Sequence, residues 1–338
     1  MTDTNSVDEL RAYGRAGLTV GPIGYGVAAL GNLYRAMPAD VWPGCVPAAW
    51  DAGVQYFDVA PHYGLGLAEE RLGGSLRNMP REEYVLSTKV GRLIEPNPDY
   101  RPGDTDIDNL FDVSTTRRRR FDFSRDGVLR SVEDSLTRLG LDRIDVLLVH
   151  DPDEHEREAL DGAFPALEEL RSQGVIRSYG AGMNQSAMLT RFVEQTDLDI
   201  VMCAGRYTLL DQGAERDLLP AAAARGVSVA VAAVFNSGIL ATERPPAEAT
   251  YDYGRAPLEL IARTERIADI AAGYGATVPQ LAVQFPRRHP SVSTVVLGAD
   301  SAAQITRNAG LGDVPVPDDL WRELEDAGLI ARLSTEGP

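Results

Sequence analysis

Short apolar segments rich in β-branched residues recur along the chain, and a segment with helical periodicity follows most of them. Their apolarity is continuous rather than alternating, which is typical of parallel strands that are covered on both faces. We expect a glycine-broken first strand within residues 18–30, after a small hairpin, and further strands over residues 56–60, 84–89, 145–150, 176–182, 200–205, 227–234 and 294–299.

The segments between these strands have the pattern of amphipathic helices. Residues 126–139 place their apolar side chains on one helical face, and residues 158–172 and 258–274 show similar apolar stripes. Eight strands that alternate with helices over roughly 300 residues predict a closed (β/α)8 TIM barrel rather than an open doubly wound sheet. We expect one domain over residues 1–338.

Two long segments, residues 91–123 and 240–257, interrupt this alternation and are rich in proline, glycine and charge. Both follow predicted strands, on the C-terminal face where barrel enzymes build their active sites. Loops of this length are typical of functional lids or of disordered segments. The four arginines at 117–120 lie among aspartates, so we expect a solvated loop there rather than a binding patch.

The composition narrows the range of partners. Asp and Glu outnumber Lys and Arg by 50 to 33, and a net charge of −17 argues against nucleic acid and against an anionic membrane surface. Two widely spaced cysteines, Cys45 and Cys203, favour a reducing compartment. Residues 1–14 are polar and lack the pattern of a signal peptide, and no apolar run approaches the ~18 residues of a membrane span. We therefore expect a cytoplasmic protein; its oligomeric state is left open.

Ionisable residues lie at the ends of three consecutive predicted strands. Asp58 is near the end of one strand and Tyr63 follows it, while Lys89 and His150 end the next two. Parallel barrel strands end on one rim, so these four side chains are expected to meet over one pocket. A buried ammonium favours a phenolate, so Lys89 is expected to lower the pKa of Tyr63, with Asp58 holding Lys89 in place. His150 would complete a hydrogen-bonded cluster and orient a substrate oxygen, in a site that exchanges protons while another group moves a hydride.

Each of these residues taken alone is more often a surface, capping or packing residue, and only the set of four favours chemistry. A metal site built from His62, His150, Asp58 and Asp151 is one alternative, but a lysine among such ligands repels a cation. A non-catalytic barrel that binds a nicotinamide nucleotide is another alternative, although a binder has no need for both Tyr63 and Lys89.

The sequence resembles the aldo-keto reductase superfamily over essentially its whole length. The segments that carry the resemblance are FDVAPHYG at 57–64, GLAEERLGGSL at 66–76, the strand ending in Lys89, and LGLDRIDVLLVH at 139–150. It implies that Asp58, Tyr63, Lys89 and His150 are the catalytic residues. Within the superfamily the chain looks most similar to the branch of L-fucose, L-galactose and D-threo-aldose 1-dehydrogenases, and pyridoxal 4-dehydrogenase is similar to that branch.

The resemblance also assigns residues to a nicotinamide nucleotide. Met183 and Asn184 fall where the family holds the carboxamide, and Ser237 and Gly238 match its pyrophosphate loop, with Phe235 beside them. Three positions depart from the family pattern. Met183 replaces a serine, Ala204 replaces a glutamine, and Ala232 replaces the aromatic residue that stacks on the ring.

The resemblance places the adenosine ribose at the last strand and the following helix, at Gly298, Asp300, Gln304 and Asn308. Family members that prefer NADP have basic residues here to bind the 2′-phosphate. Since Gly298 and Gln304 occupy those positions and Asp300 adds negative charge, we expect NAD as the preferred cofactor and NADP as the alternative. Arg307 is the one basic residue nearby that argues the other way.

The function implied is oxidation of the anomeric hydroxyl of a free aldose to a lactone, with His62 and Asp151 as candidate substrate contacts. The expected partner is a small sugar or another cyclic hemiacetal, with no metal, nucleic acid or membrane. Two alternatives remain within the superfamily, a pyridoxal 4-dehydrogenase and an NADPH-dependent reductase of aldehydes or ketones.

Overall fold

Eight parallel strands close into a barrel in the structure, a computed structural model that describes residues 10–332. Around the barrel the order is β3, β4, β5, β8, β9, β10, β11, β14 and back to β3. The predicted (β/α)8 TIM barrel is therefore confirmed. The strands are β3 (Ile23–Gly26), β4 (Tyr56–Asp58), β5 (Val85–Val90), β8 (Val146–His150), β9 (Ser178–Met183), β10 (Ile200–Ala204), β11 (Ser228–Ala232) and β14 (Val292–Gly298).

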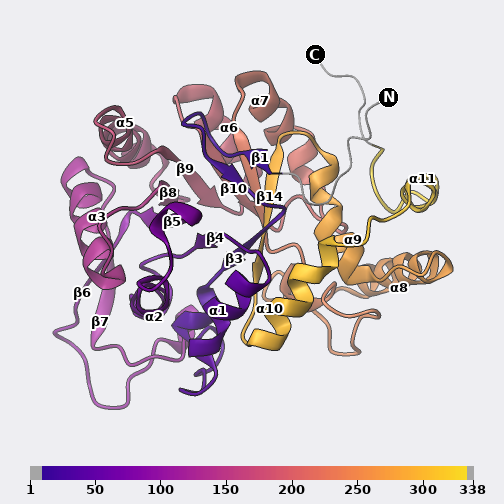
Figure 1. The fold of residues 1–338 in the computed structure, drawn as a ribbon, viewed down its shortest axis with the longest axis horizontal. Coiled ribbons are helices and arrows are strands. Elements are labelled where there is room, and N and C mark those ends of the chain that lie inside the picture. Colours follow the sequence, from indigo (N-terminus) through magenta and orange to yellow (C-terminus); the bar gives the residue numbers. More distant parts are fainter. Residues whose placement is uncertain (1–9, 333–338) are drawn as a thin grey trace.

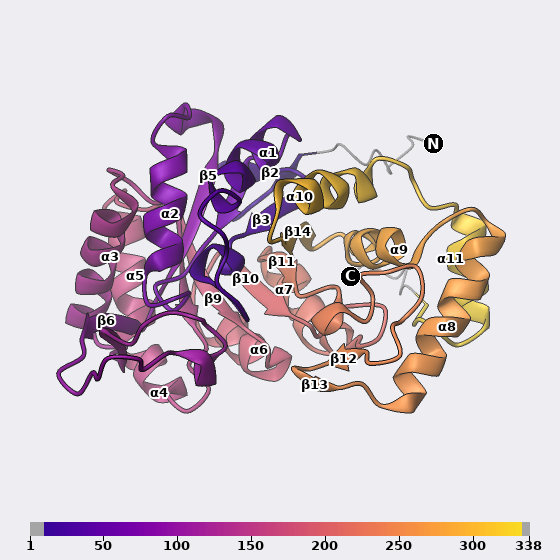
Figure 2. The same cartoon turned by 90° about the horizontal axis from the view of Figure 1, so that it is seen from below.

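Helices surround these strands and cover their outer faces, as Figure 2 shows. Within residues 10–332, no helix is long and apolar enough to cross a bilayer. The helices are α1 (Cys45–Asp51), α2 (Leu67–Leu76), α3 (Arg125–Leu139), α4 (Glu156–Glu158), α5 (Phe164–Ser172), α6 (Ser186–Gln195), α7 (Leu218–Arg225), α8 (Leu258–Gly273), α9 (Val278–Gln284), α10 (Ala302–Ala309) and α11 (Asp318–Asp326).

Helix α3 illustrates how local sequence sets these boundaries. The Ser124 hydroxyl accepts a hydrogen bond from the Gly127 N–H at 3.1 Å, which satisfies one of the unpaired donors at the helix start. Gly140 ends the helix in the left-handed region at φ 62°, a conformation that costs glycine little. Val128, Val132 and Leu139 are buried against the barrel.

The N-terminal end of the barrel is closed by a small hairpin of β1 (Arg11–Ala12) and β2 (Thr19–Val20), as expected before the first strand. Tyr13 directly follows β1. Its hydroxyl is 2.8 Å from that of Tyr56 on β4, and both rings are buried inside the barrel. Residues 1–9 of the polar start of the chain, which entered the expectation of a cytoplasmic location, lie outside the described residues.

Residues 91–123 form an ordered wall rather than the aperiodic loop expected from their composition. Antiparallel strands β6 (Arg92–Pro96) and β7 (Arg117–Phe121) pair directly after β5 and extend beyond the barrel in Figure 1. An isolated bridge from Leu33 to Phe111 ties the connection between them to the loop after β3. Residues 240–257 likewise contain a hairpin, made of β12 (Thr250–Tyr251) and β13 (Gly254–Arg255).

The solvated-loop interpretation of residues 117–120 is wrong for the same reason, because these arginines form strand β7. Three of them do lie near the surface, but the Arg119 side chain is only 12% exposed and pairs with the buried Asp106. Alternate residues of a strand point to opposite faces, so Arg117 and Arg119 share a face. Of these two, Arg117 stays 46% exposed and Arg119 is the buried one.

Candidate active site

Lys89 lies at the centre of a buried cluster on the C-terminal rim of the barrel. Its ammonium donates to Oδ2 of Asp58 at 2.7 Å, to the carbonyl of Val59 at 3.0 Å and to the hydroxyl of Tyr63 at 3.1 Å. An ammonium has three N–H groups, so these acceptors use all of them. Lys89 is thereby locked in one position, and the hydrogen of the Tyr63 phenol must point away from it.

A chain of buried hydroxyl groups fixes the other oxygen of Asp58. Ser87 donates to Oδ1 of Asp58 at 2.7 Å, and its hydroxyl lies 3.0 Å from that of Tyr56, which in turn contacts Tyr13. Buried hydrogen-bond chains of this kind hold their members in a single arrangement. The carboxylate that positions Lys89 is therefore anchored through the barrel interior.

The two central groups have shifted pKa values. Burial disfavours the charged ammonium, but Asp58 and Tyr63 outweigh that cost, so the pKa of Lys89 lies above its ordinary value. Burial raises the pKa of Tyr63, and the adjacent Lys89 offsets this only in part. Lys89 lowers the pKa of Tyr63, as expected, but burial of the phenol is the larger effect and the pKa lies above its ordinary value.

His150 ends β8 and joins this cluster through ring contacts. Its ring centroid lies 5.8 Å from that of Tyr63 and 5.6 Å from that of His62. Burial, followed by the nearby Arg92, holds the pKa of His150 well below its ordinary value, so the imidazole is neutral. Its Nδ1 is buried without a hydrogen-bond partner in the described chain. The predicted rim position is confirmed, while the contact with Tyr63 is between rings rather than by a hydrogen bond.

His62 is held by the wall that β6 and β7 form. Arg119 donates through Nε to Nδ1 of His62 and through a second nitrogen to the His62 carbonyl, and it binds both carboxylate oxygens of Asp106. Burial and then Arg119 lower the pKa of His62 to about 2. His62 is therefore neutral, and because its Nδ1 accepts a hydrogen bond, its hydrogen resides on Nε2.

Asp151, directly after β8, pairs with Arg92 at the start of β6. The Arg92 guanidinium donates to Oδ2 of Asp151 at 2.7 Å, and the same oxygen lies 3.5 Å from Nε2 of His150. Burial raises the pKa of Asp151, and Arg92 opposes this shift. The backbone of Asp151 is in the left-handed region at φ 40°, which is uncommon outside glycine and frequent at functional sites.

The four residues considered for a metal site do not surround a common ligand position. Asp58 binds Lys89 and Ser87, and Nδ1 of His62 accepts from Arg119. Across residues 10–332, no group of three or more His, Cys, Asp and Glu side chains is placed to hold a metal ion.

The residues assigned to the nicotinamide lie on adjacent strand ends of the same rim. Met183 is buried at the end of β9, Ala204 ends β10 and Ala232 ends β11, where it is paired with Ala204 in register. Asn184 follows Met183 and is partly exposed. The three departures from the family pattern are therefore neighbours, and two of them are small side chains.

The assigned pyrophosphate loop has an unusual backbone. Asn236, Ser237 and Gly238 follow one another with positive φ values of 45°, 58° and 103°. Two N–H groups of this turn are already used, because those of Asn236 and Gly238 donate to the carbonyls of Ala233 and Phe235 at 3.0 and 2.9 Å. Oδ1 of Asn236 is buried without a partner within residues 10–332, and the β12–β13 hairpin is fastened to the loop through a Tyr253 N–H to Ser237 Oγ bond. The Ser237 hydroxyl accepts that bond and keeps its own hydrogen, so it is the group of this loop that can donate to a nucleotide pyrophosphate.

At the assigned ribose position, Gln304 and Asn308 on α10 bond back to the end of β14. Gln304 accepts from the Asp300 N–H at 2.7 Å, and Asn308 donates to the Gly298 carbonyl at 3.3 Å. Asp300 pairs with Arg35, an exposed residue of the loop after β3, at 2.5 Å. Arg35 could not be singled out from the sequence, because it is 265 residues away from Asp300.

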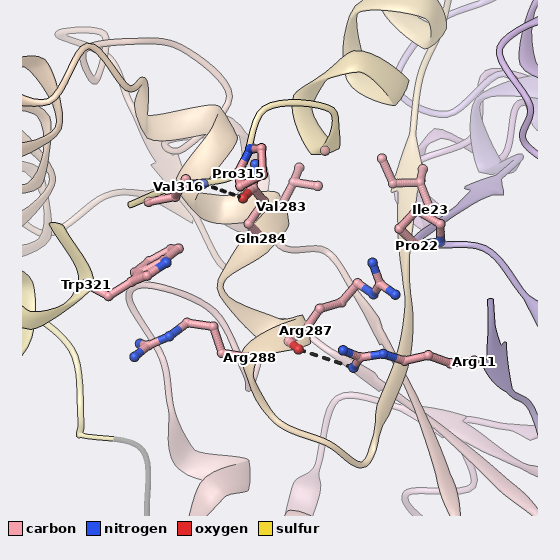
Figure 3. Close-up of a pocket in the computed structure, with 11 residues that line it drawn as sticks. Arg11, Pro22, Ile23, Val283, Gln284, Arg287, Arg288, Pro315, Val316 and Trp321 are labelled. Carbon is pink, nitrogen blue, oxygen red and sulfur yellow. Dashed lines mark hydrogen bonds between the residues drawn. The ribbon is translucent and has the colours of Figure 1, made fainter. Parts of the chain in front are cut away.

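A separate pocket lies at the opposite, N-terminal end of the barrel, where Ile23, Trp321 and several arginines line it (Figure 3). Arg11 donates to the carbonyls of Arg287 and Val292 there, and Arg288 pairs with Glu325 and lies over the Trp321 ring. These contacts hold the hairpin and α11 in place, and we assign this pocket no part in the chemistry of the rim.

The chain belongs to the aldo/keto reductase family, whose model matches residues 22–328. It is an oxidoreductase that acts on a CH–OH group with a nicotinamide cofactor, as the family does. A D-threo-aldose 1-dehydrogenase from a Pseudomonas species is 48% identical over 94% of this chain and 97% of its own length. A pyridoxal 4-dehydrogenase from Microbacterium luteolum is 42% identical over 96% and 98%.

Among solved structures, a glycerol dehydrogenase from Gluconobacter oxydans superposes with a TM-score of 0.77 at 21% identity, over 99% of this chain and 98% of its own. At that identity the likeness shows the fold alone.

Four residues around the rim were not singled out from the sequence: Arg35, Arg92, Phe111 and Arg119. Phe111 stacks against Tyr63 with ring centroids 6.0 Å apart, and the arginines bind Asp300, Asp151 and Asp106. For Arg92 a usable indication existed, since it lies only three residues beyond Lys89, just past a strand end.

Proposed function

We propose that this enzyme oxidises the anomeric hydroxyl of a free aldose to the corresponding lactone, with Asp58, Tyr63, Lys89 and His150 as its catalytic residues. The observation that carries this proposal is the fully coordinated Lys89, which donates at once to Asp58, Val59 and Tyr63. It leaves the Tyr63 phenol directed away from the ammonium, next to the neutral ring of His150.

In the oxidation, the C1–H bond breaks as a hydride leaves and the anomeric O–H proton passes to the oxygen of Tyr63. The nicotinamide nucleotide supplies the hydride acceptor when it is bound. Tyr63 must be a phenolate to take the proton, and Lys89 stabilises that negative charge through its hydrogen bond. Neutral His150 donates to the anomeric oxygen and keeps it in line with Tyr63. His62, likewise neutral, and Asp151 contact the remaining hydroxyls.

The residues proposed to bind the nucleotide are Met183, Asn184, Phe235, Ser237, Gly238, Gly298, Asp300, Gln304 and Asn308. Asn184 would hold the carboxamide alone, because Met183 contributes no hydroxyl. The Ser237 hydroxyl, whose hydrogen is not used by the Tyr253 bond, would donate to the pyrophosphate.

NAD is the cofactor that these residues favour. A 2′-phosphate at this position would approach the carboxylate of Asp300. Asp300 already pairs with the guanidinium of Arg35, and that of Arg307 contacts Oδ1 of Asn308 at 3.4 Å. We expect kcat/KM to be at least about 10-fold higher with NAD⁺ than with NADP⁺, which is the effect of a single unfavourable charge interaction in the bound complex.

The variant Asp300→Ala should narrow that preference, because it removes the repulsion and releases Arg35 to bind a phosphate. The double variant Asp300→Ala/Arg35→Ala should restore part of the preference for NAD⁺. Steady-state kinetics with both cofactors measure this, and a wild-type enzyme that favours NADP⁺ would contradict the assignment.

A pyridoxal 4-dehydrogenase is the second candidate, and the 42% identity to such an enzyme over 96% of the chain favours it. Pyridoxal also forms a cyclic hemiacetal that is oxidised to a lactone, so the catalytic residues would act in the same way. Reduction of NAD⁺ over a panel of L-fucose, L-galactose and pyridoxal, with the product identified, distinguishes the two candidates.

A further inference from the structure

Three ion pairs surround the neutral side chains of Tyr63, His62 and His150. They are Lys89–Asp58, Arg119–Asp106 and Arg92–Asp151, with closest N–O distances of 2.7, 2.5 and 2.7 Å. Each cation has its own carboxylate. The three pairs therefore leave no unneutralised cation to bind an anionic substrate. The site suits an uncharged substrate that forms hydrogen bonds.

The two arginine pairs differ in how many hydrogen bonds they use. Arg119 binds both oxygens of Asp106 and also both Nδ1 and the carbonyl of His62. Arg92 makes one side-chain bond, to Oδ2 of Asp151, and its Nε is buried without a partner within residues 10–332. A buried donor left unpaired costs free energy, and such a group in a native structure calls for an explanation.

Asp151 offers the complementary acceptor. Its side chain is 30% exposed, against 5% for Asp106, and Arg92 uses only one of its two oxygens. The left-handed backbone at Asp151 places this carboxylate beside His150, whose Nε2 is 3.5 Å away. Arg92 and Asp151 therefore lie together at the edge of the cluster, and each still has a hydrogen-bonding atom without a partner within residues 10–332.

Adjacent hydroxyls on a sugar ring present the matching pattern, since each hydroxyl both donates and accepts. One hydroxyl can donate to the open oxygen of Asp151. Its neighbour can accept from Nη1 of Arg92, which makes no bond within residues 10–332 and, unlike Nε, is not fully buried. Both bonds would be charge-assisted and therefore among the stronger ones. A hemiacetal ring that lacks the hydroxyls would leave Arg92 and Asp151 bonded only to each other.

We propose that Arg92, together with Asp151, is a specificity-determining residue that binds two neighbouring hydroxyls of the aldose. This inference rests on the proposed function. It extends that function by assigning the recognition of the substrate hydroxyls, as distinct from the chemistry at C1, to an ion pair between β6 and the end of β8. The pair makes the enzyme select polyhydroxylated hemiacetals over hemiacetals whose only hydroxyl is the anomeric one.

The test compares the best aldose of the panel with 2-hydroxytetrahydropyran, a cyclic hemiacetal that has the anomeric hydroxyl and no other. Arg92→Met should lower kcat/KM for the aldose by about 10- to 100-fold, the effect of losing a charged hydrogen bond. For 2-hydroxytetrahydropyran the loss should stay under about 3-fold, because that substrate makes no bond to Arg92.

Arg120→Gln is the matched control, because Arg120 lies on the same hairpin and pairs with Glu95 and Asp122 near the surface. It should leave both substrates unaffected. Arg92→Lys keeps the charge opposite Asp151 but has a single donor group, so it should give the same selective loss to a smaller degree. This second variant carries the test if Arg92→Met does not fold.

Equal losses on both substrates would overturn the proposal, because Arg92 would then act through His150 or Tyr63 rather than on the hydroxyls. Unchanged selectivity in both Arg92 variants would overturn it as well. Failure of the proposed function would be seen separately, as a wild-type enzyme that oxidises no aldose at all.

Discussion

Replacing Tyr63 by phenylalanine should lower kcat for aldose oxidation by about 10²- to 10⁴-fold, the usual contribution of a positioned general base. The hydroxyl lies 3.1 Å from Nζ of Lys89, and no other group in our mechanism receives the substrate proton. Binding of the nicotinamide nucleotide, measured by fluorescence titration, should change little. The wild-type rate should rise with pH from neutral to alkaline conditions, because burial raises the pKa of Tyr63 and the phenolate is the active form.

Tyr84→Phe is a suitable control for this variant. Tyr84 lies just before β5, at the other end of the barrel, and its buried hydroxyl has no hydrogen-bond partner among the described residues. This variant should keep the wild-type kcat and pH profile. Near-normal turnover by Tyr63→Phe, or the same pH-dependent rise in that variant, would contradict the role of Tyr63.

Lys89→Met should reduce both activity and stability. Among residues 10–332, Lys89 is the only cation bonded to Asp58, whose side chain is 3% exposed. A buried charge left without its partner costs about 3–5 kcal/mol. Turnover should fall by about 10²-fold or more, since the phenolate of Tyr63 loses its stabilising donor. Denaturant unfolding and steady-state kinetics measure the two losses.

The double variant Asp58→Asn/Lys89→Met separates these two effects. The neutral amide no longer needs a cation and can still accept from Ser87, so much of the stability should return. Activity should not return, because Tyr63 still lacks Lys89. A single variant Lys89→Met that is as stable as the wild type would show that the pair is not the buried ion pair described above.

The barrel was predictable because continuous apolar runs mark buried parallel strands. All eight predicted strand segments overlap a barrel strand, and the offsets are confined to their ends, as for 84–89 against Val85–Val90. Helix α3 was predicted almost residue for residue, since an apolar stripe marks it in the sequence. In these elements the local pattern and the tertiary structure agree.

The wall formed by residues 91–123 was not predictable in the same way. Strand β7 consists of four arginines and a phenylalanine, so it has no apolar alternation. Ion pairs such as Arg120 with Glu95 and Arg119 with Asp106 stabilise it, and pairing between charged side chains leaves no periodic pattern in a sequence.

The positions of the four central residues on one rim followed from the ends of the predicted strands, as the structure confirms for Asp58, Lys89 and His150. The raised pKa of Tyr63 could not be predicted from the sequence, because burial of the phenol depends on tertiary neighbours such as Phe111. Arg35 and Arg92 were missed because long side chains from loops reach partners that are distant in the sequence.

The central claim is that the hydride leaves the anomeric carbon of a free aldose and that a lactone is formed. The direct measurement uses L-fucose or L-galactose deuterated at C1, with NAD⁺, and follows both products by NMR and mass spectrometry. We predict that deuterium appears in the reduced nicotinamide, one equivalent for each lactone, and that the rate falls relative to the unlabelled sugar. Aldoses that give no lactone, with turnover confined to pyridoxal or to NADPH-dependent reduction of aldehydes, would contradict the claim.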